Sequence, residues 1–268
     1  MNIYLLSAFR DNYLFLLHFP QEKMAVVVDP GDPVPVLRKL QELDAELVAI
    51  LNTHHHWDHV DGNLALQSAF PEVVIYGSQV DRGRIPGQTV FLQDGDRISV
   101  GSRQIEVLLV PGHTQGHLAY YFPPQVESTI AQPGAEDGSG DLFCGDTIFS
   151  AGCGRLKEGT PEQMWTSLAR LRSLPESTRI WCAHEYTLSN LQFALRVDPN
   201  NIALQARYQT VQHLRAQQQP TIPTWIELEK RTNPFLRCDQ PSIQQQVNQL
   251  DPVNTLAALR QWKEQVTG

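Results

Sequence analysis

The chain has 268 residues, a net charge of −8, 41% hydrophobic residues and 19% charged residues. This composition is ordinary for a globular protein with a substantial core, and the length favours one large domain with a smaller one. The acidic balance argues against broad capture of nucleic acid, whose phosphates require a face rich in Lys and Arg.

Two features of the sequence bear on the compartment. No apolar run approaches the roughly 20 residues of a bilayer span, and the start carries Arg10 and Asp11 where a signal peptide is apolar. The four cysteines are irregularly spaced and form no Cys-x-x-Cys pair, which is typical of free thiols. They are Cys144, Cys153, Cys182 and Cys238. We therefore expect a soluble, unexported, cytoplasmic protein without membrane or nucleic-acid partners.

The first part of the chain consists mainly of short β-rich runs set against Gly, Pro and Asp. The expected strands are Tyr13–Leu17, Ala25–Val28, Leu47–Leu51, Val73–Tyr76, Ile105–Val110, Ala119–Phe122, Leu142–Cys144 and Arg179–Cys182. Helical patterns interrupt them at Val34–Leu43, Asn63–Phe70 and Pro161–Leu174. Thr160 is the expected cap of the last helix, with Pro161 as its first residue. This order predicts a layered domain of the α+β class over residues 1–186.

Two later segments differ from this pattern. Gln125–Gly140 is rich in Pro, Gly and acids and is expected to be an exposed loop insertion. After Tyr186 the β-branched runs disappear. Helical patterns follow at Leu188–Val197, Asn201–Gln218, Pro241–Gln249 and Thr255–Gln265. A helical domain is therefore expected over residues 187–268.

The chemistry is concentrated in a run of histidines. Residues 53–59 read Thr-His-His-His-Trp-Asp-His and lie between the strand ending at Leu51 and the helix starting at Asn63. In extended backbone His54 and His56 project to the same side and can bind one ion, while the turn into the helix directs Asp58 and His59 toward a second. His55 should point away.

Three later residues follow strands in the same way: His113, Asp146 and His184. A single histidine would indicate only a solvated loop, but this recurrence favours a metal site. Five histidines and two carboxylates suffice for two ions if one carboxylate bridges. His117 is expected to orient ligands by hydrogen bonding, because the ligand set is already full. His18 and His213 stand alone and are read as structural.

The signature at residues 54–59, followed by His, Asp and His, resembles that of the metallo-β-lactamase superfamily. This resemblance implies an αββα sandwich. Within the superfamily the chain is similar, over essentially its whole length, to the glyoxalase II (hydroxyacylglutathione hydrolase) family. The similarity is carried by Val28–Gly31, Gly145–Phe149, Gly152–Arg155, Glu158–Thr160, His184–Thr187, Asn233–Arg237 and the helical tail.

The family resemblance also implies roles for individual residues. His54, His56 and His113 would bind the first ion; Asp58, His59 and His184 would bind the second; Asp146 would bridge both. Asp58 and Asp146 would act in catalysis through a metal-bridging hydroxide. Contacts to glutathione would fall on Arg155, Lys157, Tyr186, Arg260 and Lys263. The family usually carries an aromatic residue where this chain has Lys157.

The implied reaction is hydrolysis of S-(2-hydroxyacyl)glutathione, such as S-lactoylglutathione, to glutathione and a 2-hydroxy acid, in methylglyoxal detoxification. Two ions about 3.5–4 Å apart would lower the pKa of a bridging water toward about 7, and the thiolate would leave without a strong acid. Glutathione carries two carboxylates, which Arg155, Arg260 and Lys263 could bind. Without the resemblance each cation would be read as a solvated surface charge.

Several alternatives stay open. Zinc is the first expectation for the two divalent ions, but iron and manganese suit His and carboxylate ligands equally. Another enzyme of the superfamily could share the ligand set: a persulfide dioxygenase with one iron, a lactonase, or a ribonuclease, which the acidic balance disfavours. A noncatalytic metal protein is disfavoured because structural zinc sites are closed by four ligands. The sequence leaves the acyl group and the oligomeric state open, with a monomer as the first expectation.

Overall fold

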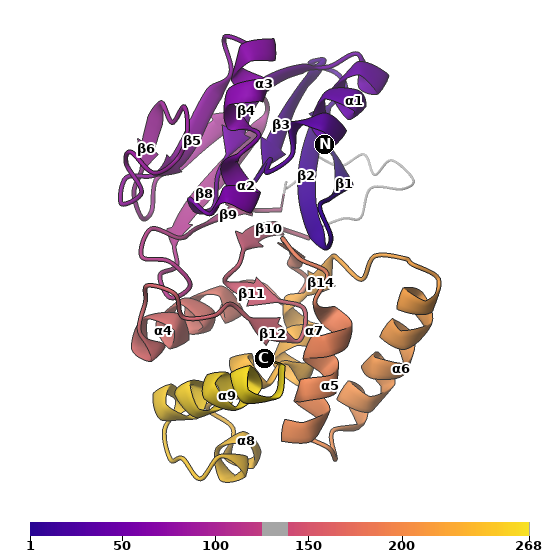
Figure 1. Ribbon diagram of the computed structural model, residues 1–268, viewed down its shortest axis with the longest axis vertical. Coiled ribbons are helices and arrows are strands. Elements are labelled where there is room, and N and C mark those ends of the chain that lie inside the picture. Colours follow the sequence, from indigo (N-terminus) through magenta and orange to yellow (C-terminus); the bar gives the residue numbers. More distant parts are fainter. Residues whose placement is uncertain (125–138, 268) are drawn as a thin grey trace.

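Two stacked six-stranded sheets form the centre of the molecule in the computed structural model, which describes residues 1–124 and 139–267 (Figure 1). The loop expected at residues 125–140 lies almost wholly outside the described residues. The first sheet has the order β1-β2-β3-β4-β5-β6. Its strands are β1 (Asn2–Ala8), β2 (Asn12–Phe19), β3 (Met24–Val28), β4 (Glu46–Leu51), β5 (Val74–Ser78) and β6 (Val90–Leu92). The pairs β1–β2 and β2–β3 are antiparallel, whereas β3 to β6 run parallel.

The second sheet has the order β14-β13-β10-β9-β8-β7. Its strands are β7 (Arg97–Val100), β8 (Arg103–Leu109), β9 (Leu118–Phe122), β10 (Asp141–Gly145), β13 (Arg179–Cys182) and β14 (Thr224–Trp225). Only β10 and β13 pair in parallel. All eight strands expected from the sequence are confirmed within a few residues of their expected ends.

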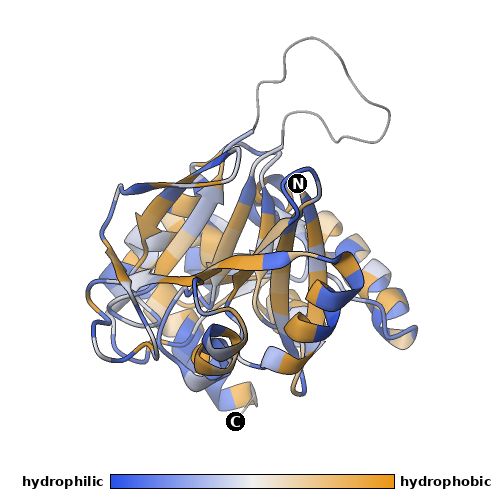
Figure 2. Ribbon diagram, turned by 90° about the horizontal axis from the view of Figure 1, so that it is seen from above, coloured by the Kyte–Doolittle hydropathy of each residue, from blue (hydrophilic) through white to orange (hydrophobic). Residues whose placement is uncertain are grey.

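Both faces of the first sheet are covered, which explains why all eight residues of β2 are buried. Phe15 and Leu17 face the second sheet and join the core that contains Val107 and Tyr120. Leu14 and Leu16 belong to a separate cluster with helices α1 (Pro33–Leu43) and α3 (Asn63–Ala69). In Figure 2 the apolar strands run through the middle of the molecule with helices at its flanks. The αββα sandwich is therefore confirmed.

Helix α4 (Pro161–Arg172) adds Met164, Leu168 and Leu171 to the cluster that contains Val107 and Tyr120 of the second sheet. The hydroxyl of Thr160 accepts the N–H of Gln163, and the Gln163 side chain accepts the N–H of Thr160. This reciprocal capping box, with Pro161 as first residue, confirms the predicted start of the helix.

The C-terminal part is mainly helical, as expected, and lies below the sheets in Figure 1. It contains α5 (Thr187–Val197), α6 (Ile202–Ala216), α7 (Ile226–Thr232), the 3-10 helix η1 (Pro234–Arg237), α8 (Pro241–Gln246) and α9 (Pro252–Thr267). Three elements of this part were not expected: α7, η1 and β14, which lies between α6 and α7 and pairs with β13. A two-residue strand has no periodicity that a sequence pattern could reveal.

A small hairpin links the sheets to the helical part. Its strands are β11 (Ile148–Phe149) and β12 (Gly152–Cys153), and all six residues from Ile148 to Cys153 are buried. All four cysteines are unpaired and buried, as the sequence predicted. Among the described residues, no helix combines the length and apolar character that crossing a membrane requires.

Candidate metal centre

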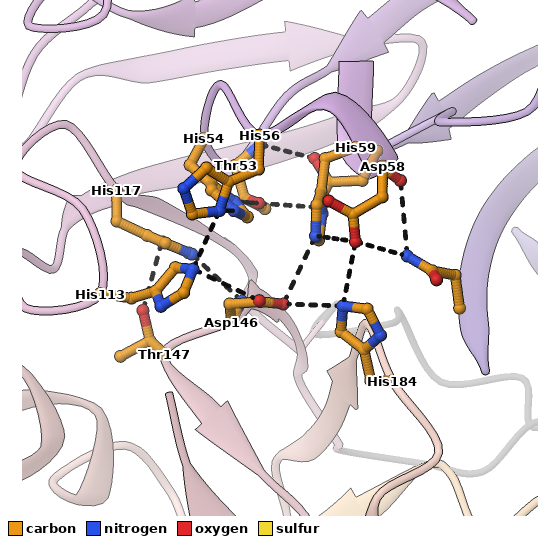
Figure 3. A network of polar contacts seen from close by, with 12 residues as sticks. Thr53, His54, His56, Asp58, His59, His113, His117, Asp146, Thr147 and His184 are labelled. Carbon is orange, nitrogen blue, oxygen red and sulfur yellow. Dashed lines mark hydrogen bonds and ion pairs between the residues drawn. The ribbon is translucent and has the colours of Figure 1, made fainter. Parts of the chain in front are cut away.

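The strand ends of both sheets bring the seven candidate ligands together. His54 and His56 follow β4, and the short helix α2 (Trp57–Val60) carries Asp58 and His59. From the second sheet, His113, Asp146 and His184 follow β8, β10 and β13. Figure 3 shows these side chains pointing toward one centre, with Asp146 between the two sets of histidines.

Three ring nitrogens form the first group. Nδ1 of His56 lies 2.9 Å from Nε2 of His54 and 3.0 Å from Nε2 of His113. Neutral imidazoles whose lone pairs converge in this way cannot all satisfy one another by hydrogen bonds. This convergence is the arrangement of a cation site, and the three residues can hold one ion together.

The second group contains Asp58, His59 and His184. Oδ2 of Asp58 lies 3.6 Å from Nε2 of His59 and 3.5 Å from Nε2 of His184. Asp146 faces both groups: its Oδ1 lies 3.5 Å from Nε2 of His59 and 3.4 Å from Nε2 of His184, and its Oδ2 lies 3.4 Å from Nε2 of His113. One carboxylate can therefore supply one oxygen to each group.

The unsatisfied polar atoms fit bound cations. Nε2 of His59 and Oδ1 of Asp146 are buried and have no hydrogen-bond partner among the described residues, although such atoms are costly unless something binds them. Ligands about 2.0–2.2 Å from one metal ion lie roughly 3–3.5 Å apart, which is the spacing in both groups. Imidazole and carboxylate donors suit zinc, iron and manganese.

Three of the candidate ligands, His113, His184 and His59, make a hydrogen bond through the ring nitrogen that faces away from the centre. Nδ1 of His113 donates to the carbonyl of Arg155 at 2.8 Å, and Nδ1 of His184 lies 2.9 Å from Oδ1 of Asp11. Nδ1 of His59 lies 3.0 Å from Oδ2 of Asp29. These contacts keep the proton on Nδ1 and leave Nε2 free for a cation.

Asp29 and Asp11 are site residues that the sequence analysis did not single out. Asp29 has a left-handed backbone with φ of 50° and also accepts the N–H and the hydroxyl of Thr53. A Cβ on Gly31 would lie 1.9 Å from the carbonyl oxygen of Asp58, so this loop approaches the ligand loop closely. The Asp-Pro-Gly run was a usable signal for Asp29, whereas Asp11 meets a residue 173 positions away.

The remaining two histidines of the neighbourhood point elsewhere. Nε2 of His117 accepts the N–H of Asp146 at 3.1 Å, and its Nδ1 lies 3.2 Å from the hydroxyl of Thr147. His117 therefore contacts a candidate ligand through a hydrogen bond, and its role in orienting ligands stays a prediction. His55 turns away from the centre, and its Nδ1 lies 3.0 Å from Oδ1 of Asp81.

The electrostatics suit binding of positive ions. Burial, with neighbouring imidazoles, holds the pKa of His54 well below its ordinary value, so this ring is neutral. For Asp146 burial acts in the opposite direction, but His184, His59 and His113 together hold its pKa well below its ordinary value. A neutral imidazole and an ionised carboxylate are the forms that bind metals.

The five residues predicted to contact the substrate lie in different settings. Arg155 and Lys157 are exposed, and the N–H of Lys157 donates to the carbonyl of His113 at 3.2 Å. The ring of Tyr186 stacks on His184 with centroids 4.8 Å apart. Arg260 and Lys263 are 5% and 8% exposed, so neither is an ordinary solvated charge.

Comparison with known proteins gives a consistent result. Two family profiles match: the metallo-beta-lactamase superfamily over residues 12–125 and the hydroxyacylglutathione hydrolase C-terminus over residues 185–266. The hydroxyacylglutathione hydrolase of Synechococcus sp. (strain JA-3-3Ab) is 59% identical over 265 residues, which cover 99% of this chain and 100% of the relative. That of Acaryochloris marina is 58% identical over the same shares of the two chains.

Solved structures show the same fold at lower identity. ETHE1 from Myxococcus xanthus has a TM-score of 0.62 and 22% identity, and the match covers 96% of this chain and 100% of that one. TTHA1623 in a di-iron-bound form has a TM-score of 0.58 and 24% identity, with 88% of this chain and 100% of that one covered.

Proposed function

Since the chain belongs to the hydroxyacylglutathione hydrolase (glyoxalase II) family of the metallo-β-lactamase superfamily, we propose that it hydrolyses S-(2-hydroxyacyl)glutathione thioesters. It is a metal-dependent hydrolase, and S-lactoylglutathione is the substrate, giving glutathione and lactate in methylglyoxal detoxification. The observation that carries this proposal is the pair of three-ligand groups with Asp146 between them. Relatives named for this activity match from end to end.

The centre is proposed to hold two divalent ions, with zinc as the first choice. His54, His56 and His113 would hold one ion, Asp58, His59 and His184 the other, and Asp146 would bind both. When bound, the ions would acidify a water to give the nucleophile and polarise the carbonyl of the thioester. Asp58 and Asp146 thus serve catalysis by holding ions, and no Ser or Cys nucleophile is required.

The surrounding residues keep the donors in place. Asp29, Asp11 and the carbonyl of Arg155 hold the protons on the outer ring nitrogens, so the inner nitrogens present lone pairs without rearrangement. The leaving group is a thiolate, which departs without a strong general acid. This explains why the centre needs no acid besides water.

Binding of the glutathione part is proposed for five residues: Arg155, Lys157, Tyr186, Arg260 and Lys263. The best support comes from Arg260. Its Nε is buried without a hydrogen-bond partner among the described residues, and a buried guanidinium edge of this kind is suited to a carboxylate. Tyr186 lies against His184 and so next to the proposed reaction centre. The backbone N–H of Lys157 donates to the carbonyl of His113, and the residue is exposed, so its side chain is free to bind a carboxylate of glutathione.

The organisation of the chain follows from these roles. We assign residues 1–186 to a catalytic domain and residues 187–268 to a helical substrate-binding domain. A monomer in the cytoplasm, without nucleic-acid or membrane partners, is proposed on the basis of the acidic net charge and the four unpaired cysteines.

The test is a thioesterase assay with S-lactoylglutathione on protein whose metal content has been counted. Two ions per chain and rapid release of glutathione are expected. The chief alternative is a persulfide dioxygenase, which would contain one iron and consume oxygen. Oxygen uptake with a glutathione persulfide, without thioester hydrolysis, would overturn the proposal. Full metal occupancy without any hydrolysis would instead indicate a noncatalytic metal protein.

A further inference from the structure

The hairpin β11–β12 lies between the metal centre and the helical part of the chain. On one side the ring of Phe149 contacts those of His184 and Tyr186, with centroids 5.8 and 5.2 Å apart. The turn of the hairpin places Ala151 in a left-handed backbone with φ of 57°. This conformation is unfavourable for a residue other than glycine, so contacts with neighbouring residues must stabilise it.

Asn233, just before η1, binds both strands of the hairpin. It is fully buried, and its Nδ2 donates to the carbonyl of Gly152 at 2.9 Å and to that of Phe149 at 3.3 Å. Its Oδ1 accepts the N–H of Phe235 at 3.0 Å and so caps η1. One side chain therefore fixes the hairpin to the start of a helical turn.

Glu229 on α7 holds the strained turn itself. It is fully buried, and its Oε2 accepts the N–H of Ala151 and the Nδ2 of Asn233, each at 2.9 Å. Its other oxygen faces Arg207 on α6, whose guanidinium also donates to the hydroxyl of Ser150 at 2.8 Å. A buried carboxylate is tolerated only when it is paired and hydrogen-bonded in this way.

The hairpin is in turn connected to the two buried cations of α9. Nη1 of Arg260 donates to the carbonyl of Cys153 at 3.1 Å. Lys263 donates to the side chain of Asn190, whose Nδ2 donates to the carbonyl of Ser150 at 2.9 Å. The hairpin backbone is thus a shared support for both side chains.

We propose that Asn233 and Glu229 are positioning residues that fix the hairpin at residues 148–153, and that the hairpin holds Arg260 and Lys263 in place for glutathione. The inference rests on the proposed function. It gives α7 and η1 a part in substrate recognition although neither contributes a residue to the proposed glutathione contacts. Loss of this support should weaken recognition of glutathione more than the chemistry at the metal centre.

The test compares two thioesters in wild type and in Asn233→Asp. S-lactoylglutathione carries the glutathione carboxylates, whereas the lactoyl thioester of N-acetylcysteamine carries the same acyl group without them. Asn233→Asp keeps the oxygen that caps η1 but turns a second oxygen toward the carbonyls of Phe149 and Gly152 and toward Oε2 of Glu229. The matched control is Asn201→Asp, because Asn201 caps α6 through Leu204 and donates to Asp198 and Arg231 but not to the hairpin.

We expect Asn233→Asp to raise KM for S-lactoylglutathione about tenfold or more, the effect of losing roughly one charge-assisted hydrogen bond. Its kcat, metal content and activity on the short thioester should stay within about twofold of wild type, as should all values for the control. Equal losses on both thioesters would show a merely structural role and overturn the inference, as would unchanged kinetics.

Two further outcomes are separable. If the wild-type protein does not prefer S-lactoylglutathione to the lactoyl thioester of N-acetylcysteamine, the proposed function is wrong. That result would not bear on the role of the hairpin. If Asn233→Asp does not fold, Glu229→Gln decides, since it keeps an oxygen for Arg207 but replaces the acceptor that faces Ala151 and Asn233. The same selective rise in KM is expected there, and its absence would overturn the inference.

Discussion

Oδ2 of Asp29 lies 3.0 Å from Nδ1 of His59, and Oδ1 of the same carboxylate accepts the N–H of Thr53 at 2.7 Å. Asp29 follows β3, whereas Thr53 and His59 follow β4, so one buried carboxylate joins the ends of two parallel strands. The contact fixes both the proton and the direction of the His59 ring. Asp29 thereby shapes the second ligand group while its own oxygens are already occupied.

Asp29→Asn should weaken metal binding about 10–100-fold, the usual effect of losing the hydrogen-bond partner of a ligating imidazole. The amide keeps one acceptor oxygen and presents N–H groups where the other oxygen of Asp29 now accepts, so the three contacts from Thr53 and His59 cannot all be kept. Metal affinity measured against a buffered zinc series checks this. Asp141→Asn is the control, because Asp141 is also buried but pairs with Arg179 and Trp181 at the start of β10. Equal affinities in both variants would contradict the role of Asp29.

Asp58→Ala should remove one ion per chain and reduce hydrolysis of S-lactoylglutathione by at least about 10²-fold, because Lewis-acid stabilisation is worth several kcal/mol. The variant also leaves Nδ2 of Asn12 without its acceptor at 2.9 Å. Metal counting and steady-state kinetics on the same sample check both effects. Undiminished turnover with two ions retained would rule out Asp58 as a ligand.

Arg260→Ala should raise KM for S-lactoylglutathione about 10–100-fold and leave kcat almost unchanged, because hydrogen bonds to charged groups contribute about 1.5–3 kcal/mol. The effect should appear in binding since the residue is proposed to contact the glutathione part. Arg38→Ala on the exposed face of α1 is the control for loss of a positive charge. An unchanged KM in Arg260→Ala would show that the proposed pocket is wrong.

The affinity for substrate should fall at alkaline pH because of Lys263. Burial, and then the charge of Arg260, lowers the pKa of this side chain from 10.5 to about 8. Only the protonated form can bind a carboxylate, so KM should rise roughly tenfold between pH 7 and pH 9. Lys263→Arg should remove this rise, because a guanidinium stays charged in that range. A KM that rises equally in both proteins would exclude Lys263 as the cause.

The contribution of Lys263 to the stability of the fold should rise with pH, whereas its contribution to substrate affinity falls. Its pKa is depressed in the folded protein, so the unfolded chain keeps the proton up to about pH 10.5 while the folded chain loses it near pH 8. The unfolded state binds more protons between these values, and the contribution to stability therefore rises with pH. Denaturant unfolding of wild type and Lys263→Arg at several pH values separates this term from that of other groups.

The larger elements of the fold could be predicted because their sequence patterns reflect burial. β2 and β4 are apolar on both faces, and α4 carries a local capping box that marks its start. β1 was missed because it lies at the edge of its sheet and keeps several partly exposed residues. β11, β12 and β14 have two residues each, which is too short for any period.

The seven candidate ligands could be found because each follows a strand and stands close to a Gly, Ala or His neighbour in sequence. Their partners could not. Asp11 meets His184 only after the first sheet has packed against the second, and Asn12 meets Asp58 only after β2, β3 and β4 have paired. Equally, nothing local distinguished Arg260 and Lys263 from surface charges, since their burial depends on packing of α9 against distant residues such as Cys153 and Asn190.

The pairing of β14 with β13 determines whether the first 186 residues can fold without the C-terminal part. β13 delivers His184, and its outer side is hydrogen-bonded by a strand that belongs to the C-terminal part. A fragment ending near Tyr186 would leave the backbone of Arg179 and Ile180 without this pairing. Open strands of this kind recruit other chains and promote aggregation. The two parts are therefore expected to fold as one cooperative unit, and expression of the first part alone should give insoluble protein.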